Sequence, residues 1–237
     1  MIRGAIIAEV ATLVADPARA TMVSALLDGR ALTASELASA ARITPQTASA
    51  HLGKLTKAGL LCMERDGRHR YFRLASAKVA EMIEGIVAVA LEKRPRFRPL
   101  SGYEHAISAA RICYDHLAGR VSVDLAAALI TREYIVLDDQ AGEITAAGAR
   151  FFTEFGLRLP AQRSTRRRFC RPCLDWTERR PHIAGALGAA ITRRLFDLGW
   201  IERMKRGHEV IVTPLGQRGL QQTFGVEASE PADRTRR

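Results

Sequence analysis

Five side chains able to bind metal or act as nucleophiles fall in two short clusters in the second half of the sequence. The first cluster is Cys113-x2-His116, and the second is Cys170-x2-Cys173 with His182 nine residues further on. Thiolate and imidazole groups are the ligands of tetrahedral zinc and of softer thiophilic ions. Two intervening residues let both ligands of a pair reach one ion. If the clusters meet in the fold, they can form one metal site.

Two other interpretations of these residues stay open. The arginines around Cys170 and Cys173 stabilise thiolates and make them oxidisable, so the pair can also serve as a redox switch. In the structural alternative, Cys113 is a small core residue, and His116 and His182 lie at helix N-termini bonded to backbone carbonyls. The arginine-rich stretch can alternatively bind an anionic effector or DNA. Its arginines are Arg163, Arg166, Arg167, Arg168, Arg171, Arg179 and Arg180.

The elements that must position both clusters form an internal repeat. Each copy predicts a helix, a strand centred on an aromatic residue, a loop, a strand beginning near a threonine, and a short helix. Neither copy has a polar helix suited to reading bases, so we expect a paired α+β effector domain. A pseudo-twofold axis between the copies would bring the clusters together. The aligned segments are 116–119 with 182–185, 133–135 with 199–201, 144–148 with 212–216 and 155–157 with 224–226.

A helix-turn-helix is predicted between Leu32 and Leu61. Thr33 and Glu36 form a capping box that begins a short helix. Thr44-Pro45 begins a second helix, because threonine caps helices and proline is accepted in their first turn. The second helix has a buried stripe at helical spacing, which leaves its other face polar. The stripe consists of Ala48, Leu52 and Leu55.

A basic β-hairpin follows this second helix. Gly59 ends the helix, and the segments 60–63 and 71–74 predict two strands that turn at Asp66-Gly67. Short polar and cationic side chains on the helix and the hairpin tip suit base edges and phosphates, as in a winged helix-turn-helix. The candidate DNA-binding residues are Thr44, Gln46, Thr47, Ser49, His51, Lys54, Arg65, Arg68, His69 and Arg70.

Residues from about 5 to 92 resemble the ArsR/SmtB family of bacterial winged-helix repressors. The resemblance implies a homodimer paired through terminal helices, promoter binding without inducer, and release when an inducer binds. The family's usual soft-metal cysteine pair is absent from the helix that begins at Ala34, so the resemblance does not identify the inducer. The matching segments are DPAR at 16–19, SELA at 35–38, QTASAHLGKLTKAGL at 46–60 and DGRHRYFRL at 66–74.

Composition agrees with a DNA-binding protein. The formal net charge of +11 favours a polyanionic partner, since phosphate neutralisation supplies most sequence-independent affinity for DNA. The apolar start is interrupted by Glu9 and lacks a signal-peptide cleavage pattern, so we expect a cytoplasmic protein with reduced cysteines and no membrane contact.

An enzyme is not expected, because the sequence has neither a nucleotide-binding glycine loop nor a Gly-x-Ser-x-Gly elbow. The alternative is a thiol-redox or metal-binding enzyme or protein in which the helix-turn-helix is only a tether to DNA. Such redox enzymes place Cys-x2-Cys at the start of a helix within a βαβ unit. No such pattern precedes Phe169.

The predicted fold is mainly α with small β wings, an α+β protein of two domains. The helix from Ser76 to Leu91 has a continuous aliphatic face and is the expected dimer seam. The expected partners are a near-palindromic DNA operator and a second copy of the chain, and the expected cofactor is zinc or another thiophilic ion. If the cysteines only pack, the sensor would be a small-molecule pocket between the repeats near Tyr134 and Trp200. The expected segments are a winged domain over 1–92, a basic linker over 93–100, an effector domain over 101–226 with repeats at about 107–160 and 174–226, and a disordered tail over 227–237.

Overall fold

The computed structural model describes residues 2–92, 102–138, 141–158, 169–204 and 209–228. The chain divides into two compact units, Met1–Glu84 and Gly85–Arg237, and the division falls within one helix, α5. The expected linker over 93–100 lies outside the described residues, as do residues 229–237 of the expected tail. Within the described ranges, every helix is too short or too polar to cross a membrane.

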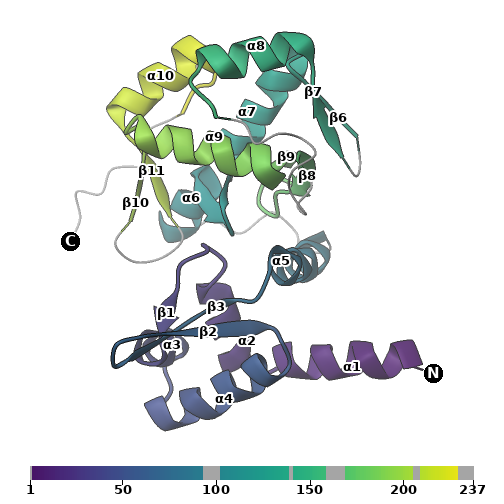
Figure 1. The fold of residues 1–237 in the computed structure, drawn as a ribbon, viewed down its shortest axis with the longest axis vertical. Helices are drawn as coiled ribbons and strands as arrows, with labels where there is room; N and C mark the ends of the chain where they lie inside the picture. Colours follow the sequence, from purple (N-terminus) through teal and green to yellow (C-terminus); the bar gives the residue numbers. More distant parts are fainter. Residues whose placement is uncertain (1, 93–101, 139–140, 159–168, 205–208, 229–237) are drawn as a thin grey trace. The chain divides into compact units, whose positions relative to one another are not determined.

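The first unit is a set of helices with one small antiparallel sheet (Figure 1). The sheet has the strand order β1-β3-β2, in which β2 and β3 form a hairpin. The core is aliphatic, and Met22, Leu26, Leu37, Leu52 and Leu55 are all essentially inaccessible to solvent. The elements are α1 Ile2–Val14, α2 Pro17–Ala25, β1 Leu32–Thr33, α3 Ala34–Ala41, α4 Pro45–Lys57, β2 Leu61–Asp66, β3 His69–Leu74 and α5 Ala77–Glu92.

The predicted helix starts are confirmed. Thr33 accepts a hydrogen bond from the backbone N–H of Glu36, and the Glu36 carboxylate accepts one from the backbone N–H of Thr33. Thr44 likewise accepts from Thr47 N, with Pro45 at the first helical position. A cap of this kind stabilises a helix by about 1 kcal/mol. Helices α3 and α4 therefore form the predicted helix-turn-helix.

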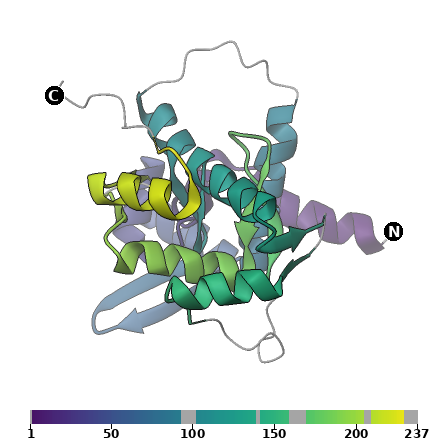
Figure 2. The same cartoon turned by 90° about the horizontal axis from the view of Figure 1, so that it is seen from above.

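The hairpin turn lies one residue later than predicted. Asp66 pairs with His69 across the strands, so the two-residue loop is Gly67-Arg68 instead of Asp66-Gly67. Gly67 has φ +56°, a left-handed conformation that glycine adopts without steric penalty. The shift moves Arg68 to the tip of the hairpin, which extends beyond the helices of its unit (Figures 1 and 2).

The second unit contains the predicted internal repeat, but the helices and strands within each copy differ from those predicted. Each copy runs hairpin, helix, hairpin, helix, and the first hairpin of each copy was not predicted. Thr145 and Thr213 do not start strands: each caps the helix that follows. The first copy is β4 Arg111–Cys113, β5 His116–Ala118, α7 Arg120–Thr131, β6 Ile135–Leu137, β7 Gly142–Ile144 and α8 Ala146–Glu154, preceded by α6 Gly102–Ala109. The second is β8 Arg171–Leu174, β9 Pro181–Ala184, α9 Gly185–Asp197, β10 Ile201–Arg203, β11 Val210–Val212 and α10 Pro214–Phe224.

The two copies are interlocked around one core. Helix α7 of the first copy packs on β9 of the second, and α9 of the second packs on β5 of the first. Each copy also donates a side-chain hydrogen bond to a helix end of the other copy. Arg132 donates to the carbonyl of Thr223, and Arg194 donates to the carbonyl of Phe155. These contacts make the copies a single pseudo-symmetric domain.

Aromatic side chains surround Tyr134 and Trp200, the residues beside which a sensor pocket is predicted as the alternative. Tyr134 stacks on Phe151 with ring centroids 4.4 Å apart, and Trp200 lies 5.7 Å from Phe155. Phe224 packs edge-on to Phe151 and Phe155, where α8 and α10 meet (Figure 1). Tyr134 and Trp200 are therefore half-buried and packed against the core, and a sensor pocket beside them stays a prediction.

Candidate nucleic-acid interface and candidate metal centre

The polar face of α4 and the tip of the β2–β3 hairpin carry the candidate DNA contacts. The buried stripe Ala48, Leu52 and Leu55 holds α4 in the core and turns its opposite face outward. A groove of about 630 Å³ lies between α4 and the hairpin, lined among others by Ser49 and Arg68. Lys57 also lines it, a cation that is not among the residues predicted from the sequence. The exposed candidates are Thr44, Gln46, Thr47, Ser49, Lys54, Arg65, Arg68, His69 and Arg70.

His51 differs from the other candidates. It is half-buried, and its Nδ1 lies 3.3 Å from the guanidinium of Arg19 on α2. Arg19 itself donates to the carbonyls of Thr12 and Leu13 at the end of α1. The helical spacing placed His51 on the polar face, but the neighbouring helix covers that edge of α4. His51 therefore has an internal role whether or not it also contacts DNA.

Two hairpins of the second unit bring together four of the five predicted ligands. Cys113 lies directly opposite His116 across β4 and β5, and Cys173 lies directly opposite His182 across β8 and β9. Each copy of the repeat thus contributes one cross-strand cysteine–histidine pair. The pairs meet because β5 and β9 pack together, and the two histidine rings stack with centroids 5.1 Å apart.

The geometry of this Cys/His cluster fits a tetrahedral ion. One ligand atom from each of Cys113, His116, Cys173 and His182 lies within 4.8 Å of all the others. Ligand atoms around tetrahedral zinc lie about 3.3–3.8 Å apart, given bond lengths of about 2.0–2.3 Å. A small contraction of side chains would therefore close the site. Two thiolates and two imidazoles are also a donor set that zinc prefers.

The histidine rings carry buried nitrogen atoms that lack hydrogen bonds. Nδ1 of His116 donates to the carboxylate of Asp115 at 3.2 Å, which leaves Nε2 as the unprotonated nitrogen. That Nε2 has no hydrogen-bond partner, and neither ring nitrogen of His182 has one. Unpaired polar atoms in a protein interior are costly, and a bound ion would satisfy one nitrogen of each ring. A carboxylate behind a ligating histidine is also the usual outer partner in zinc sites.

Asp175 ties the second copy to the first beside the cluster. It is fully buried, and its Oδ2 accepts from Arg111 at 3.0 Å and from the backbone N–H of Gly119 at 2.6 Å. Its Oδ1 accepts from Thr177 and from the backbone N–H of Glu178. The same carboxylate lies 3.8 Å from Nδ1 of His182, so it sits behind the second histidine as Asp115 sits behind the first. Neither Arg111 nor Asp175 was predicted from the sequence as a site residue, because the two meet only in the folded protein.

The cluster shifts the pKa values of its members in different directions. Burial lowers the pKa of His116, but Asp115 and the Cys173 sulfur outweigh burial and raise it above the ordinary value. Burial also dominates at His182, whose pKa is lowered. A hydrogen bond from Cys113 holds the pKa of Cys173 well below its usual range, against the effect of burial and with help from both histidines. The arrangement thus favours a thiolate at Cys173.

Cys170, the fifth predicted ligand, does not join the cluster. It packs in the apolar core, and burial raises its pKa to about 11. The reason is strand geometry: residues three apart in an extended chain point to opposite faces, so Cys170 and Cys173 diverge. The Cys-x2-Cys spacing brings both sulfur atoms to one ion only when the segment forms a turn, and here the segment is extended. The histidines, likewise, lie on strands and not at helix N-termini.

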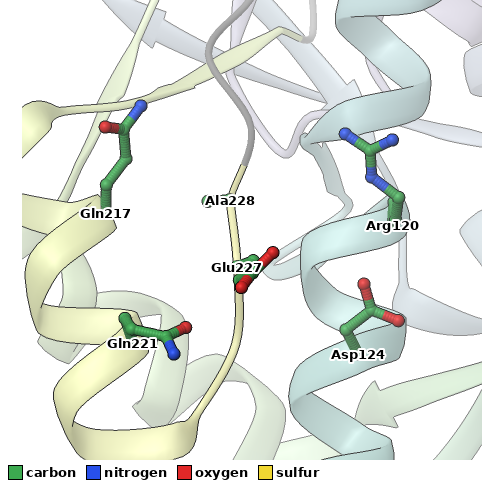
Figure 3. Close-up of a pocket in the computed structure, with 6 residues that line it drawn as sticks. All are labelled: Arg120, Asp124, Gln217, Gln221, Glu227 and Ala228. Carbon is green, nitrogen blue, oxygen red and sulfur yellow. The ribbon is translucent and has the colours of Figure 1, made fainter.

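A second, open groove lies between α7 and α10 (Figure 3). Its volume is about 630 Å³, and the chain segment that carries Glu227 and Ala228 passes between the two helices. Asp124 on one wall is 3.7 Å from the exposed Arg180, a contact within the protein. The groove is shallow and mixed in charge, so the Cys/His cluster is the stronger candidate. Its lining residues are Arg120, Asp124, Gln217, Gln221, Glu227 and Ala228.

The first unit defines the class of protein: a winged helix-turn-helix protein with the polar face of one helix and a basic hairpin exposed. A family model described as a helix-turn-helix domain matches residues 14–63. The chain is 41% identical over 221 residues to the HTH-type transcriptional regulator YdfF of Bacillus subtilis (strain 168), covering 93% of this chain and 98% of the relative. The chain therefore belongs to the family of HTH-type transcriptional regulators that includes YdfF, and the predicted helix-turn-helix is confirmed.

Solved structures similar to the chain cover about two fifths of it. The homodimeric winged helix-turn-helix DNA-binding domain of Mb0332 from Mycobacterium bovis, a possible ArsR-family regulator, is 27% identical. The match covers 41% of this chain and 89% of the Mb0332 chain, with a TM-score of 0.37. The transcriptional repressor BigR from Xylella fastidiosa is 25% identical. This match covers 37% of this chain and 88% of the BigR chain, with a TM-score of 0.34.

Proposed function

We propose that this regulator is a homodimeric repressor that leaves its operator when zinc or a similar thiophilic ion binds the Cys/His cluster. The observation that carries the proposal is the cluster itself: two cysteines and two histidines converge from two hairpins, with buried ring nitrogens left without partners. The resemblance to ArsR/SmtB repressors implies the direction of regulation. Residues of the first unit would bind DNA, and residues of the second would sense the ion.

The placement of the ligands supports a sensing role. Cys113 and His116 belong to the first copy of the repeat, and Cys173 and His182 belong to the second. An ion held by all four would therefore fix the two copies against each other. A tenfold loss of operator affinity requires about 1.4 kcal/mol of coupling between the two sites. We expect this coupling to come from rearrangement of the two hairpins and of the helices packed on them.

Metal binding can be tested on anaerobically purified full-length protein. We expect one zinc per chain, and cobalt(II) should give thiolate-to-metal absorption that zinc abolishes. The variants Cys113→Ser and Cys173→Ser should lose this absorption, whereas Cys170→Ser, matched in chemistry but outside the cluster, should retain it. A Cys113→Ser variant with the wild-type cobalt spectrum would contradict the ligand assignment.

Regulation is tested separately by gel shift on the promoter of the chain's own gene. Zinc, cadmium and arsenite are added in turn to wild-type protein and to the double variant Cys113→Ser, Cys173→Ser. We expect the effective ion to weaken wild-type binding at least tenfold and to leave the double variant on DNA. Equal release of both proteins would show that the cluster does not sense the inducer.

A further inference from the structure

We propose that the metal-free Cys/His cluster is also a modification site, in which a peroxide oxidises Cys113 and Cys173 to a disulfide that joins the two repeats. The two sulfur atoms come from β4 of one copy and β8 of the other and lie within 4.8 Å of each other. A disulfide requires a sulfur–sulfur distance of about 2.05 Å, which rotation of the two side chains can approach from this starting point.

The other cysteines of the chain are held elsewhere. Cys170 points into the apolar core on the opposite face of its strand. Cys62 lies in the first unit, on β2, where Arg73 donates to its sulfur at 3.4 Å. The fold therefore selects one pair among the four cysteines. This pair differs from Cys170 and Cys173, which the sequence spacing suggested as the redox couple.

Exposure of the two sulfurs sets the order of the reaction. Cys113 is 3% exposed, whereas Cys173 is partly open to solvent, so a small peroxide reaches Cys173 first. The Cys173 sulfur attacks a peroxide oxygen, the O–O bond breaks, and the departing hydroxide takes up the thiol proton as water. The product is a sulfenic acid at Cys173.

The second step forms the cross-link. The Cys113 sulfur attacks the Cys173 sulfur, the S–O bond breaks, and hydroxide leaves with the Cys113 proton as a second water. Two electrons have then passed from the two sulfurs to hydrogen peroxide. The disulfide removes both sulfur ligands, so ion binding and oxidation exclude each other. An oxidant would thus link the same two copies that the ion links.

The proposed disulfide lies in the same site as the proposed metal centre, but it is detected by the masses of peptides, and its formation requires neither ion nor DNA. Full-length protein is stripped with a chelator, treated with one equivalent of hydrogen peroxide, alkylated and digested with trypsin. Cys170 and Cys173 lie on one tryptic peptide, because the bond after Arg171 precedes Pro172 and resists cleavage. The experiment is therefore done with both the wild type and Cys170→Ser.

We expect both proteins to yield peptide 112–120 linked to peptide 169–179, two hydrogens lighter than the sum and separated by reductant. Zinc added before the peroxide should slow the cross-link at least tenfold. Loss of the link in Cys170→Ser, or a bond between Cys170 and Cys173 in the wild type, would overturn the inference. A link that forms equally fast with zinc would leave the disulfide in place and count against the metal site.

Discussion

His116 and His182 stack face to face across the boundary between the two repeats, with ring centroids 5.1 Å apart and planes inclined by 30°. Each ring lies directly across a hairpin from a cysteine and has a carboxylate behind its Nδ1. The pseudo-twofold relation of the repeats thus extends to their chemistry. Because equivalent positions of two copies meet at the axis, one cysteine and one histidine per copy are sufficient for a four-ligand site.

The pH dependence of metal binding should follow His116. Its pKa is raised above the ordinary 6.5, so it keeps its proton to higher pH and an ion must displace that proton. We expect metal affinity to fall about tenfold per pH unit once the pH drops below the raised pKa. In Asp115→Asn the carboxylate that raises the pKa is gone, so the fall should begin at lower pH. Competition titrations with a chromogenic chelator between pH 5.5 and about 8.5 measure this.

Asp124→Asn is the matched control for that experiment, because Asp124 lies on α7 away from the cluster and pairs only with exposed Arg180 among the contacts described. Its pH profile should equal that of the wild type. A profile for Asp115→Asn that also coincides with the wild type would mean that Asp115 does not set the proton affinity of His116.

Replacement of Asp175 by asparagine should destabilise the second unit. The Asp175 and Arg111 side chains are 0% and 5% exposed, and removal of one partner leaves the other charge buried without compensation. Such a loss costs about 3–5 kcal/mol. Asp124→Asn removes an exposed pair and should cost less than about 1 kcal/mol. Urea unfolding of both variants measures the difference, and equal values would refute the structural role of Asp175.

Acid should remove the same stabilisation. Burial opposes ionisation of Asp175, yet Arg111 and Thr177 lower its pKa below the ordinary 3.8. A lowered carboxyl pKa stabilises the fold above the unfolded value, and the stability is lost as pH falls through the folded value. The wild type should therefore lose its advantage over Asp175→Asn below pH 3.8.

The double variant Arg68→Ala, Arg70→Ala should weaken binding to all DNA sequences. Both side chains are exposed at the hairpin, where they suit phosphates. Each lost phosphate contact should reduce the slope of log affinity against log salt by about 0.9. Gel shifts at several salt concentrations test this, with the double variant Arg150→Ala, Arg218→Ala as a charge-matched control on the exposed surfaces of α8 and α10. An unchanged slope would show that the hairpin does not contact DNA.

Gln46→Ala and Ser49→Ala should act differently from the arginine variants. Their side chains lie on the exposed face of α4, so they are placed to read base edges. We expect a changed preference among operator variants of about 1–3 kcal/mol per recognised base, with little change in the salt slope. Uniform weakening on all sequences would assign these residues to phosphates instead.

The double variant Ile86→Glu, Val89→Glu should disrupt the proposed homodimer. These side chains are 49% and 67% exposed, whereas Ile83 on the same helix is 7% exposed and contributes to folding. Ile6 and Ile7 on α1 are also open to solvent. Light scattering should show monomers, and operator binding should weaken because two half-sites about 34 Å apart need two copies. Lys78→Glu, which changes charge at a polar position of α5, should remain dimeric.

Features that depend on residues close together in the chain could be predicted from the sequence alone. The caps at Thr33 and Thr44 are confirmed because each depends on hydrogen bonds within three residues of the chain. The stripe on α4 depends only on helical periodicity, so the polar face opposite to it could be predicted. The internal repeat was also visible, since it is a pattern in the sequence. The turn of the hairpin was displaced by one residue because strand register depends on pairing with the partner strand.

Only the tertiary structure decided which cysteines and histidines meet. The sequence placed Cys170 and Cys173 together by spacing, but the strand directs their side chains to opposite faces. It could not show that His116 and His182 lie on β-strands, because short strands are set by pairing more than by local propensity. The approach of β5 to β9 depends on helices α7 and α9, each packed against the other copy. Residue types determined what chemistry the chain can do, and packing between the repeats determined where it is done.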